Sequence, residues 1–169
     1  LMAGGYLVEH LKARQVAEID VGDLFEIERV DIKDGVAAAG ELPRNMFFEW
    51  HNPTGPHDLL IFIGEAQPVR GGYGFCHKVL DYALKHDTKR IFTFAAMSTQ
   101  LHPADEPRVF GATTEETLLK KMENLEVEIL ADAQISGMNG VLLAAAAEKR
   151  LPGVCLLGEL PFFAVGVPN

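Results

Sequence analysis

Two glutamates follow apolar stretches whose length suits β-strands. Glu65 comes just after Leu59–Ile63, and Glu159 comes just after Val154–Leu157. Ligands of open α/β sheets bind beyond the carboxyl ends of the strands, so two carboxylates at one rim would suit acid–base catalysis or a bound cation. The alternative is packing, in which each glutamate accepts backbone amides or pairs with an arginine such as Arg70. We favour the packing interpretation.

Other polar residues and glycines follow the predicted strands. Residues 136–140, SGMNG, precede an apolar helix, and the free amides at that helix N-terminus would cradle an anion. The segment lacks the GxGxxG and GKS/GKT patterns of nucleotide loops, and glycines that permit a tight strand-to-helix turn explain it equally well. If the rim binds a nucleotide- or phosphate-type ligand, the predicted lining is Glu65, Gln67, Ser98, Thr99, Gly137, Asn139, Gly140 and Glu159.

The remaining reactive side chains lack the partners that catalysis or metal binding requires. Ser136 lacks the GxSxG context of a hydrolase nucleophile, and Cys76 has no partner histidine at a position that would indicate a thiol enzyme. His51, His57 and Asp58 lie in a proline-containing stretch with no third ligand at a fixed spacing, which favours a solvated loop over a metal site. We therefore predict no catalytic residue, no metal and no cofactor.

Composition restricts the class of protein. With 169 residues, 48% of them hydrophobic, the chain is predicted to form one α/β domain over residues 1–169. The net charge of −9 argues against nucleic-acid binding, and no apolar run approaches the roughly 20 residues of a membrane span. Cys76 and Cys155 lie far apart without metal spacing, which is typical of reduced, buried thiols in a cytoplasmic protein.

The segment Glu126–Phe163 has the pattern strand, glycine loop, helix, turn, strand. The strands are predicted at Glu126–Ala131 and Val154–Leu157. Val141–Ala147 is apolar on every face, so its helix is expected to be buried all round or packed closely against a sheet. We expect a βαβ crossover, which places the two strands parallel to each other.

Apolar spacing and turn residues predict the other elements. In chain order they are a helix at 2–14, an antiparallel strand pair at Phe25–Val30 and Asn45–Trp50, a central strand at Leu59–Ile63, a helix from Phe75 to near Asp87, a strand at Lys89–Ala96, a short strand at Arg108–Ala112, and a helix from Thr113 or Thr114 to Met122. Thr113 and Glu116 would form a capping box on the last helix. The alternation predicts a three-layer α/β/α sandwich with a mixed, mostly parallel sheet.

Two segments, Ile135–Leu143 and Gly153–Phe163, resemble the proteasome assembly chaperone 2 family. Its members have a glycine loop with Asn-Gly before an apolar helix, then a strand running into a Leu-Leu-Gly-Glu-Pro-like turn. The family's Gly-Glu-x-x-Pro after a central strand matches Leu60–Pro68, and its Tyr-Leu pair in the first helix matches Gly5–Leu7. The resemblance implies a fold like that of purine nucleoside phosphorylases and related hydrolases.

The same resemblance implies protein partners. Family members include homo-oligomers, and eukaryotic and archaeal relatives take part in assembling proteasome rings, so proteasome subunits are the partners that it suggests. An opening strand and a closing helix of the family would lie before Leu1 and after Asn169, so we expect the chain to be a fragment of a longer protein.

Two hypotheses follow. The first is a protein-interaction or assembly module without catalysis, whose candidate contact surface is Leu160, Phe162 and Phe163, because such an apolar segment is costly to leave in water. Burial of this segment against a further helix of the same protein is the open alternative. The second hypothesis is a small-molecule binding protein or enzyme that uses the loops at the strand ends.

Overall fold

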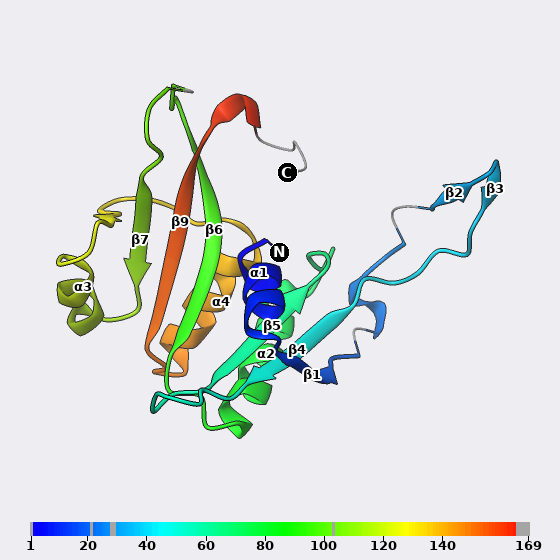
Figure 1. Cartoon of the computed structure of the whole chain (residues 1–169), viewed down its shortest axis with the longest axis horizontal. Coiled ribbons are helices and arrows are strands. Elements are labelled where there is room, and N and C mark those ends of the chain that lie inside the picture. Colours follow the sequence, from blue (N-terminus) through cyan, green and yellow to red (C-terminus); the bar gives the residue numbers. More distant parts are fainter. Residues whose placement is uncertain (1, 21, 28–29, 103, 165–169) are drawn as a thin grey trace. The chain divides into compact units, whose positions relative to one another are not determined.

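The computed structural model describes residues 2–20, 22–27, 30–102 and 104–164 of the chain (Figure 1). Contacts between residues divide it into two units, Leu1–Ala83 and Leu84–Asn169. Each unit has its own sheet and its own helices, and each is described by itself below. The single domain over residues 1–169 stays a prediction.

The first unit contains a three-stranded antiparallel sheet in the order β1-β4-β5. β4 (Asn45–Trp50) is the middle strand, with β1 (Arg14–Glu18) on one side and β5 (Leu59–Gly64) on the other. The other elements are α1 (Met2–Leu11), the 3-10 helix η1 (Gly22–Leu24), the hairpin strands β2 (Ile32–Lys33) and β3 (Val36–Ala37), and α2 (Gly72–Lys85).

Helices pack on both faces of this sheet. α1 lies so close to β5 that a Cβ atom on Gly4 would be 3.3 Å from Ile63 Cγ1, and this close approach explains a glycine inside a helix. Phe62, next along β5, points to the opposite face because strand side chains alternate. There the ring of Phe47 stacks on Tyr82 of α2, with the centroids 4.1 Å apart. The first unit is therefore a helix–sheet–helix sandwich.

The predicted strand at Phe25–Val30 is wrong. Residues 28–29 of that prediction lie outside the described residues, and the described remainder has no strand structure. The Phe25 side chain is buried instead, with its ring edge-on to Phe75 of α2 at 5.5 Å between centroids. The partner that pairs with Asn45–Trp50 in place of this segment is β1. Leu59–Ile63 does form a strand, but the central strand of its sheet is β4.

The β2–β3 hairpin lies between the two strands predicted at Phe25–Val30 and Asn45–Trp50 and was not itself predicted. Its two-residue turn, Asp34–Gly35, has positive φ at both positions, 52° and 81°, as a type I′ turn requires. The residues from 30 to 42 are all exposed, and in Figure 1 the hairpin extends away from the sheet of its unit.

The second unit contains a four-stranded sheet in the order β6-β9-β7-β8. β6 (Ile91–Thr99) and β9 (Gly153–Pro161) are parallel along their whole length. β7 (Val109–Thr113) is antiparallel to β9 and parallel to the short β8 (Glu128–Ile129). The helices are α3 (Glu116–Met122), α4 (Gly137–Glu148) and the 3-10 helix η2 (Phe162–Ala164).

Helices cover both faces of this sheet as well. Leu143 of α4 packs against the buried Cys155 and Leu157 of β9. Leu118 of α3 packs against Val154, which points to the other face. The small side chains of Ala145 and Ala146 allow α4 to lie close to the sheet, as predicted, but Ala144 and Ala147 are exposed, so the helix is not buried all round.

The predicted parallel βαβ crossover over Glu126–Phe163 is wrong. β8 is antiparallel to β9, and β7 lies between them. The reason is the connection at 130–136: Leu130 and Ile135 join the core cluster around Leu157, so this segment crosses the sheet face before α4 begins. Apolar periodicity identified the helix and the second strand correctly, but it carried no information about the direction of the first strand.

The α/β class with a mixed sheet is confirmed, although the balance of strand directions differs from the prediction. Among the described strands, the parallel pairs are β6–β9 and β7–β8, and antiparallel pairs outnumber them. The capping box of Thr113 and Glu116 is also absent from its predicted place: α3 has Glu115 at its N-cap, and the Thr113 hydroxyl donates to the Glu115 carbonyl at 3.0 Å.

The turn from α4 to β9 is a Schellman motif without glycine. Leu151 N donates to Ala146 O at 2.9 Å and Arg150 N donates to Ala147 O at 3.0 Å, while Arg150 has φ of 54°. A side chain at this left-handed position is strained because its Cβ approaches the backbone.

Arg150→Gly should therefore raise the free energy of unfolding by about 1 kcal/mol, measured by urea denaturation. The neighbouring Lys149→Gly is the control, because Lys149 has φ of −78° and gains nothing from glycine. Equal effects of the two substitutions would contradict the strain at Arg150.

Candidate functional site

The strongest polar cluster of the second unit is centred on Glu159, whose side chain is 1% exposed. Glu159 Oε1 accepts the Thr99 hydroxyl at 2.6 Å and Arg108 Nη2 at 2.8 Å. Glu159 Oε2 accepts Arg108 N at 2.9 Å and Arg108 Nε at 3.0 Å. Each carboxylate oxygen thus accepts two bonds, which uses the lone-pair sites that a carboxylate offers.

The same contacts stabilise the ionised form of Glu159. The Arg108 guanidinium, the Thr99 hydroxyl and the Arg108 amide together lower the pKa of Glu159 to about 2. The pKa of Arg108 is raised by the same ion pair and by Glu128, whose carboxylate lies 2.9 Å from Arg108 Nη1. At neutral pH Glu159 is ionised and fully bonded, so it is poorly suited to donate a proton or to bind a cation.

Glu65 makes different bonds, within the first unit. Its Oε2 accepts Arg44 N at 2.8 Å, and its own amide donates to Arg44 O at 3.0 Å. Arg70, which the packing interpretation offered as a partner for a glutamate, donates instead to the Asp23 carbonyl at 3.1 Å. Both glutamates therefore bind backbone amides, and the arginine that pairs with Glu159 is Arg108.

The other candidate residues are distributed as follows. Gln67 is exposed in the loop after β5, and Ser98 is exposed on the face of β6 opposite to Thr99. Gly137, Asn139 and Gly140 form the first turn of α4. Of the predicted lining, the hydrogen bonds bring together Thr99 and Glu159.

The glycines of the SGMNG segment have a packing explanation. Gly137 has φ of 76°, a conformation that favours glycine. A Cβ atom on Gly140 would lie 2.1 Å from the Ile135 carbonyl oxygen, a distance that no side chain tolerates. The tight start of α4 therefore requires these glycines whether or not an anion binds there.

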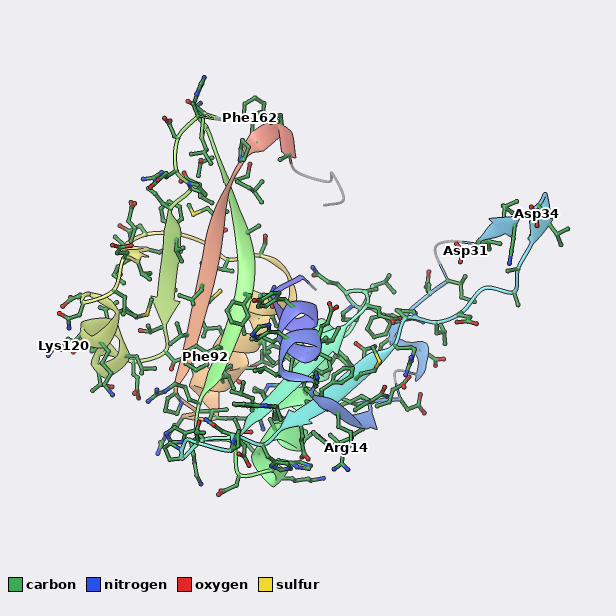
Figure 2. The ribbon with its side chains drawn as sticks, viewed as in Figure 1. Arg14, Asp31, Asp34, Phe92, Lys120 and Phe162 are labelled. Carbon is green, nitrogen blue, oxygen red and sulfur yellow. The ribbon has the colours of Figure 1, made fainter. Side chains whose placement is uncertain are left out.

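The candidate contact residues lie at the end of β9. Phe162 and Phe163 are 66% and 57% exposed, and their rings meet edge-on with centroids 5.8 Å apart. Leu160 is half-buried. Figure 2 shows Phe162 at the tip of the unit, where β9 passes into η2. Exposed aromatic rings of this size are enriched in protein–protein contacts.

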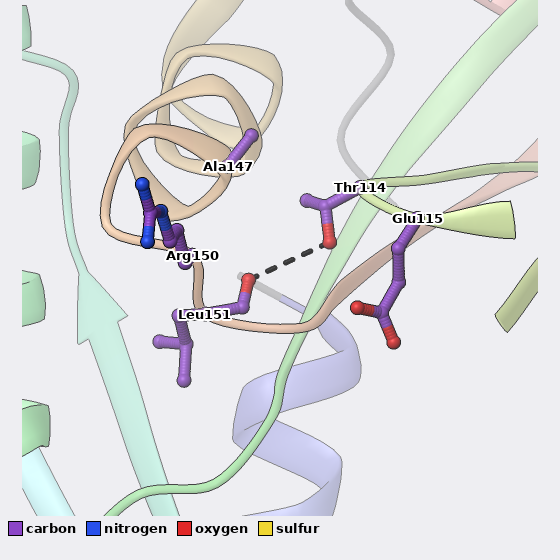
Figure 3. Close-up of a pocket in the computed structure, with 5 residues that line it drawn as sticks. All are labelled: Thr114, Glu115, Ala147, Arg150 and Leu151. Carbon is purple, nitrogen blue, oxygen red and sulfur yellow. Dashed lines mark hydrogen bonds between the residues drawn. The ribbon is translucent and has the colours of Figure 1, made fainter. Parts of the chain in front are cut away.

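A small hollow of about 200 Å³ lies at the opposite end of β9, beside the α4–β9 turn. It is lined by Thr114, Glu115, Ala147, Arg150 and Leu151 (Figure 3). Thr114 accepts Gly153 N at 2.8 Å, which holds the turn in place. The hollow is smaller than the roughly 300 Å³ at which pockets for small molecules begin.

Cys76 and Cys155 are buried, as predicted, and form no disulfide, and burial raises the pKa of both thiols, that of Cys76 to about 11. Among the described residues, no three His, Cys, Asp or Glu side chains gather in a group that would hold a metal ion. His51 Nδ1 does lie 2.8 Å from Asp58 Oδ2, in an exposed turn. Within the described part of the chain, no helix has both the length and the apolar character needed to cross a membrane.

The sequence profile of the PAC2 family matches residues 2–168. The chain belongs to the PAC2 family. The resemblance found in the glycine loop and in the β9 segment is thereby confirmed over nearly the whole sequence.

Solved structures similar to this PAC2 chain include PbaB of Pyrococcus furiosus, described as an archaeal proteasome activator. It has a TM-score of 0.76 and 29% identity, over 94% of this chain and 68% of PbaB. A proteasome-assembly chaperone homologue of Mycobacterium tuberculosis has a TM-score of 0.81 and 18% identity, over 99% of this chain and 71% of that one. The second likeness shows the fold alone.

A curated relative is an uncharacterised protein of Methanocaldococcus jannaschii, 25% identical over 127 residues, which are 73% of this chain and 48% of the relative. This PAC2 chain therefore spans about half the length of that relative.

Sequence reasoning missed Arg108 and Glu128, the other charged members of the Glu159 cluster. Arg108 was placed at the start of a strand, correctly to within one residue, but nothing in its neighbourhood indicates which carboxylate it meets. Glu159 is 51 residues away in the sequence. An arginine at a strand start can pair with a buried glutamate at the end of a neighbouring strand. This pairing can be inferred only once the strand order is known.

The pKa of Glu159 predicts an acid dependence of stability. Its folded pKa of about 2 lies below the ordinary 4.5, so its contribution is complete above about pH 4.5 and is lost as the pH falls toward 2. Glu159→Gln should lower the free energy of unfolding at pH 7 and flatten its fall between pH 4.5 and 2, measured by urea denaturation. Glu106→Gln, an exposed glutamate of the 100–107 connection, should keep the wild-type profile; an unchanged profile in Glu159→Gln would disprove the assignment.

Gly140→Ala should lower the free energy of unfolding by about 1–3 kcal/mol, because the added methyl group meets the Ile135 carbonyl. Gly5→Ala is the matched helical control: no atom lies within 4 Å of its added Cβ, so it should gain about 0.5–1 kcal/mol. Thermal unfolding followed by circular dichroism distinguishes the two. A neutral Gly140→Ala would mean that this glycine is not required for packing.

Proposed function

We propose that this PAC2 chain is a non-catalytic protein-interaction module that acts in proteasome assembly or activation, and that it works in the cytoplasm. The observation that carries the proposal is the exposed Phe162–Phe163 pair at the end of β9, in a chain 29% identical to an archaeal proteasome activator. Membership of the PAC2 family supports the same class of function.

The bonding of Glu159 supports this proposal over the small-molecule alternative. The carboxylate that would act as acid, base or ligand at the strand ends is occupied by Thr99 and Arg108. The cluster instead fixes the end of β9, and with it the position from which Phe162 and Phe163 project. Rigid presentation of aromatic side chains reduces the entropy lost on binding. The alternative, a nucleotide- or phosphate-type ligand in the strand-end loops, stays a prediction.

The Phe162→Ser/Phe163→Ser double variant tests the contact surface. Wild-type chain is expected to bind immobilised archaeal proteasome core particles or their isolated subunits, and the double variant should bind at least about tenfold more weakly, because buried aromatic anchors carry most of the binding energy of such contacts. Biolayer interferometry gives both dissociation constants.

The control is Leu125→Ser, an apolar side chain of the same unit that is 62% exposed. It should bind as wild type, and all variants should keep the wild-type circular dichroism spectrum. Absence of wild-type binding to either form of the proteasome, or equal binding by the double variant, would refute the proposal.

A further inference from the structure

The turn of the β2–β3 hairpin joins an aspartate to a glycine at an exposed position. Asp34 and Gly35 lie between the register partners Lys33 and Val36, and theirs is the single Asp-Gly pair in the sequence. Figure 2 shows Asp34 at the outer end of the hairpin. Both turn residues are exposed, so the Asp34 carboxyl group and the backbone that follows it are in contact with solvent.

An aspartate that precedes a glycine can cyclise without a catalyst. The backbone nitrogen of the glycine attacks Cγ of the protonated side chain, a C–N bond forms, and the carboxyl hydroxyl group leaves as water with the amide hydrogen. Water then opens the five-membered succinimide ring. Opening at Cγ restores aspartate, and opening at the main-chain carbonyl gives isoaspartate, whose backbone runs through Cβ and Cγ. One water molecule leaves and one returns, so no oxidant or reductant is needed.

The conformation of this turn favours ring closure. Glycine has no side chain that would hinder the approach of its nitrogen to Cγ. Asp34 has φ of 52°, a left-handed conformation that is strained for a residue with a Cβ atom, so little is lost when Asp34 leaves it. A hairpin with two residues in each strand is at best marginally stable, and the local opening of so small an element has a low free energy. Asp34 therefore reaches the ring-closing geometry readily.

A second pair with the same chemistry lies in a protected place. An asparagine before a glycine forms the same ring with loss of ammonia, and Asn139–Gly140 is such a pair. Both residues are half-buried in the first turn of α4, where Gly140 packs against the Ile135 carbonyl. Ring closure there would disrupt the start of the helix, so the fold protects this pair and leaves Asp34 accessible.

We propose that Asp34 is a modification site, at which the chain slowly forms a succinimide and then isoaspartate without an enzyme. Isoaspartate lengthens the backbone of the turn by one carbon atom. The type I′ geometry requires two residues of ordinary length, so the pairing of Lys33 with Val36 is lost when the longer residue forms. The modification opens the hairpin, and its product is a substrate for a carboxyl methyltransferase that recognises isoaspartate.

Prolonged incubation of the 169-residue chain at neutral pH and physiological temperature tests the proposal. Peptide mapping by liquid chromatography and mass spectrometry should show a second form of the Asp34 peptide with unchanged mass. An isoaspartate methyltransferase should transfer methyl groups from S-adenosylmethionine to this form. A synthetic peptide of residues 30–42 gives the rate without the fold. The chain should react within about tenfold of the peptide, which corresponds to an opening free energy of at most about 1.4 kcal/mol.

Three substitutions identify the ring closure. Asp34→Glu keeps the charge but requires a larger ring, so the product should be lost. Gly35→Ala places a methyl group beside the attacking nitrogen and should slow the reaction at least about tenfold. Asp34→Asn keeps a residue that type I′ turns favour. It should react faster than wild type, because an uncharged amide is attacked more readily than an ionised carboxylate, and with the small mass gain of an amide exchanged for a carboxyl group.

Asp31 is the control within the chain, since it lies in the same exposed segment but precedes Ile32. Trypsin cleaves after Lys33, so the two aspartates fall in different peptides, and the Asp31 peptide should stay unmodified. Absence of isoaspartate at Asp34, a rate more than about tenfold below that of the synthetic peptide, equal product at Asp31, or an undiminished yield in Asp34→Glu would each overturn the proposal. The inference goes beyond the proposed function and uses neither Phe162 nor Phe163, so its failure leaves the proteasome-binding result standing.

Discussion

Glu159 ties together three segments of the second unit through one buried carboxylate. Thr99 reaches it from the end of β6, and Arg108 reaches it from the start of β7, with both its side chain and its backbone amide. β6 ends at Thr99, and β7 begins at Val109, next to Arg108. Charge-assisted bonds are the strong ones, and here they join the end of β6 to the start of β7 through Glu159. The position of everything that projects from the end of β9 depends on this interaction.

A buried ion is stable only when the surrounding protein makes all of its hydrogen bonds, and this requirement limits what the site can do. A carboxylate whose lone pairs are occupied and whose pKa lies near 2 has little capacity left for substrate or metal. The complete set of hydrogen bonds makes the cluster rigid, and it also removes the reactivity of the Glu159 carboxylate. The exposed Phe162 ring lies just beyond this cluster, where β9 passes into η2.

The sequence predicted the apolar elements and the α/β class, because burial of a helix face or a strand leaves a periodic pattern. It did not predict strand order: the pairing of β9 with β7 depends on contacts between residues distant in sequence, and apolar runs are alike in parallel and antiparallel ladders. Glu159 was found by its place after a strand, whereas Arg108 left no local signal. The β2–β3 hairpin did leave one, the Asp34–Gly35 pair, but its strands are too short to show alternation.

The α4–β9 turn of the second unit contains a strained backbone position. Arg150 occupies a left-handed position that a glycine would fill with less strain, at the border of the hollow. Such strain alone does not mark a binding site, since Lys12 has the same φ of 54° at the end of α1. What distinguishes Arg150 is its surroundings: it lines the hollow together with Thr114 and Glu115. The two backbone bonds of the Schellman motif hold Arg150 in this conformation, so the packing of the α4–β9 turn outweighs the local strain.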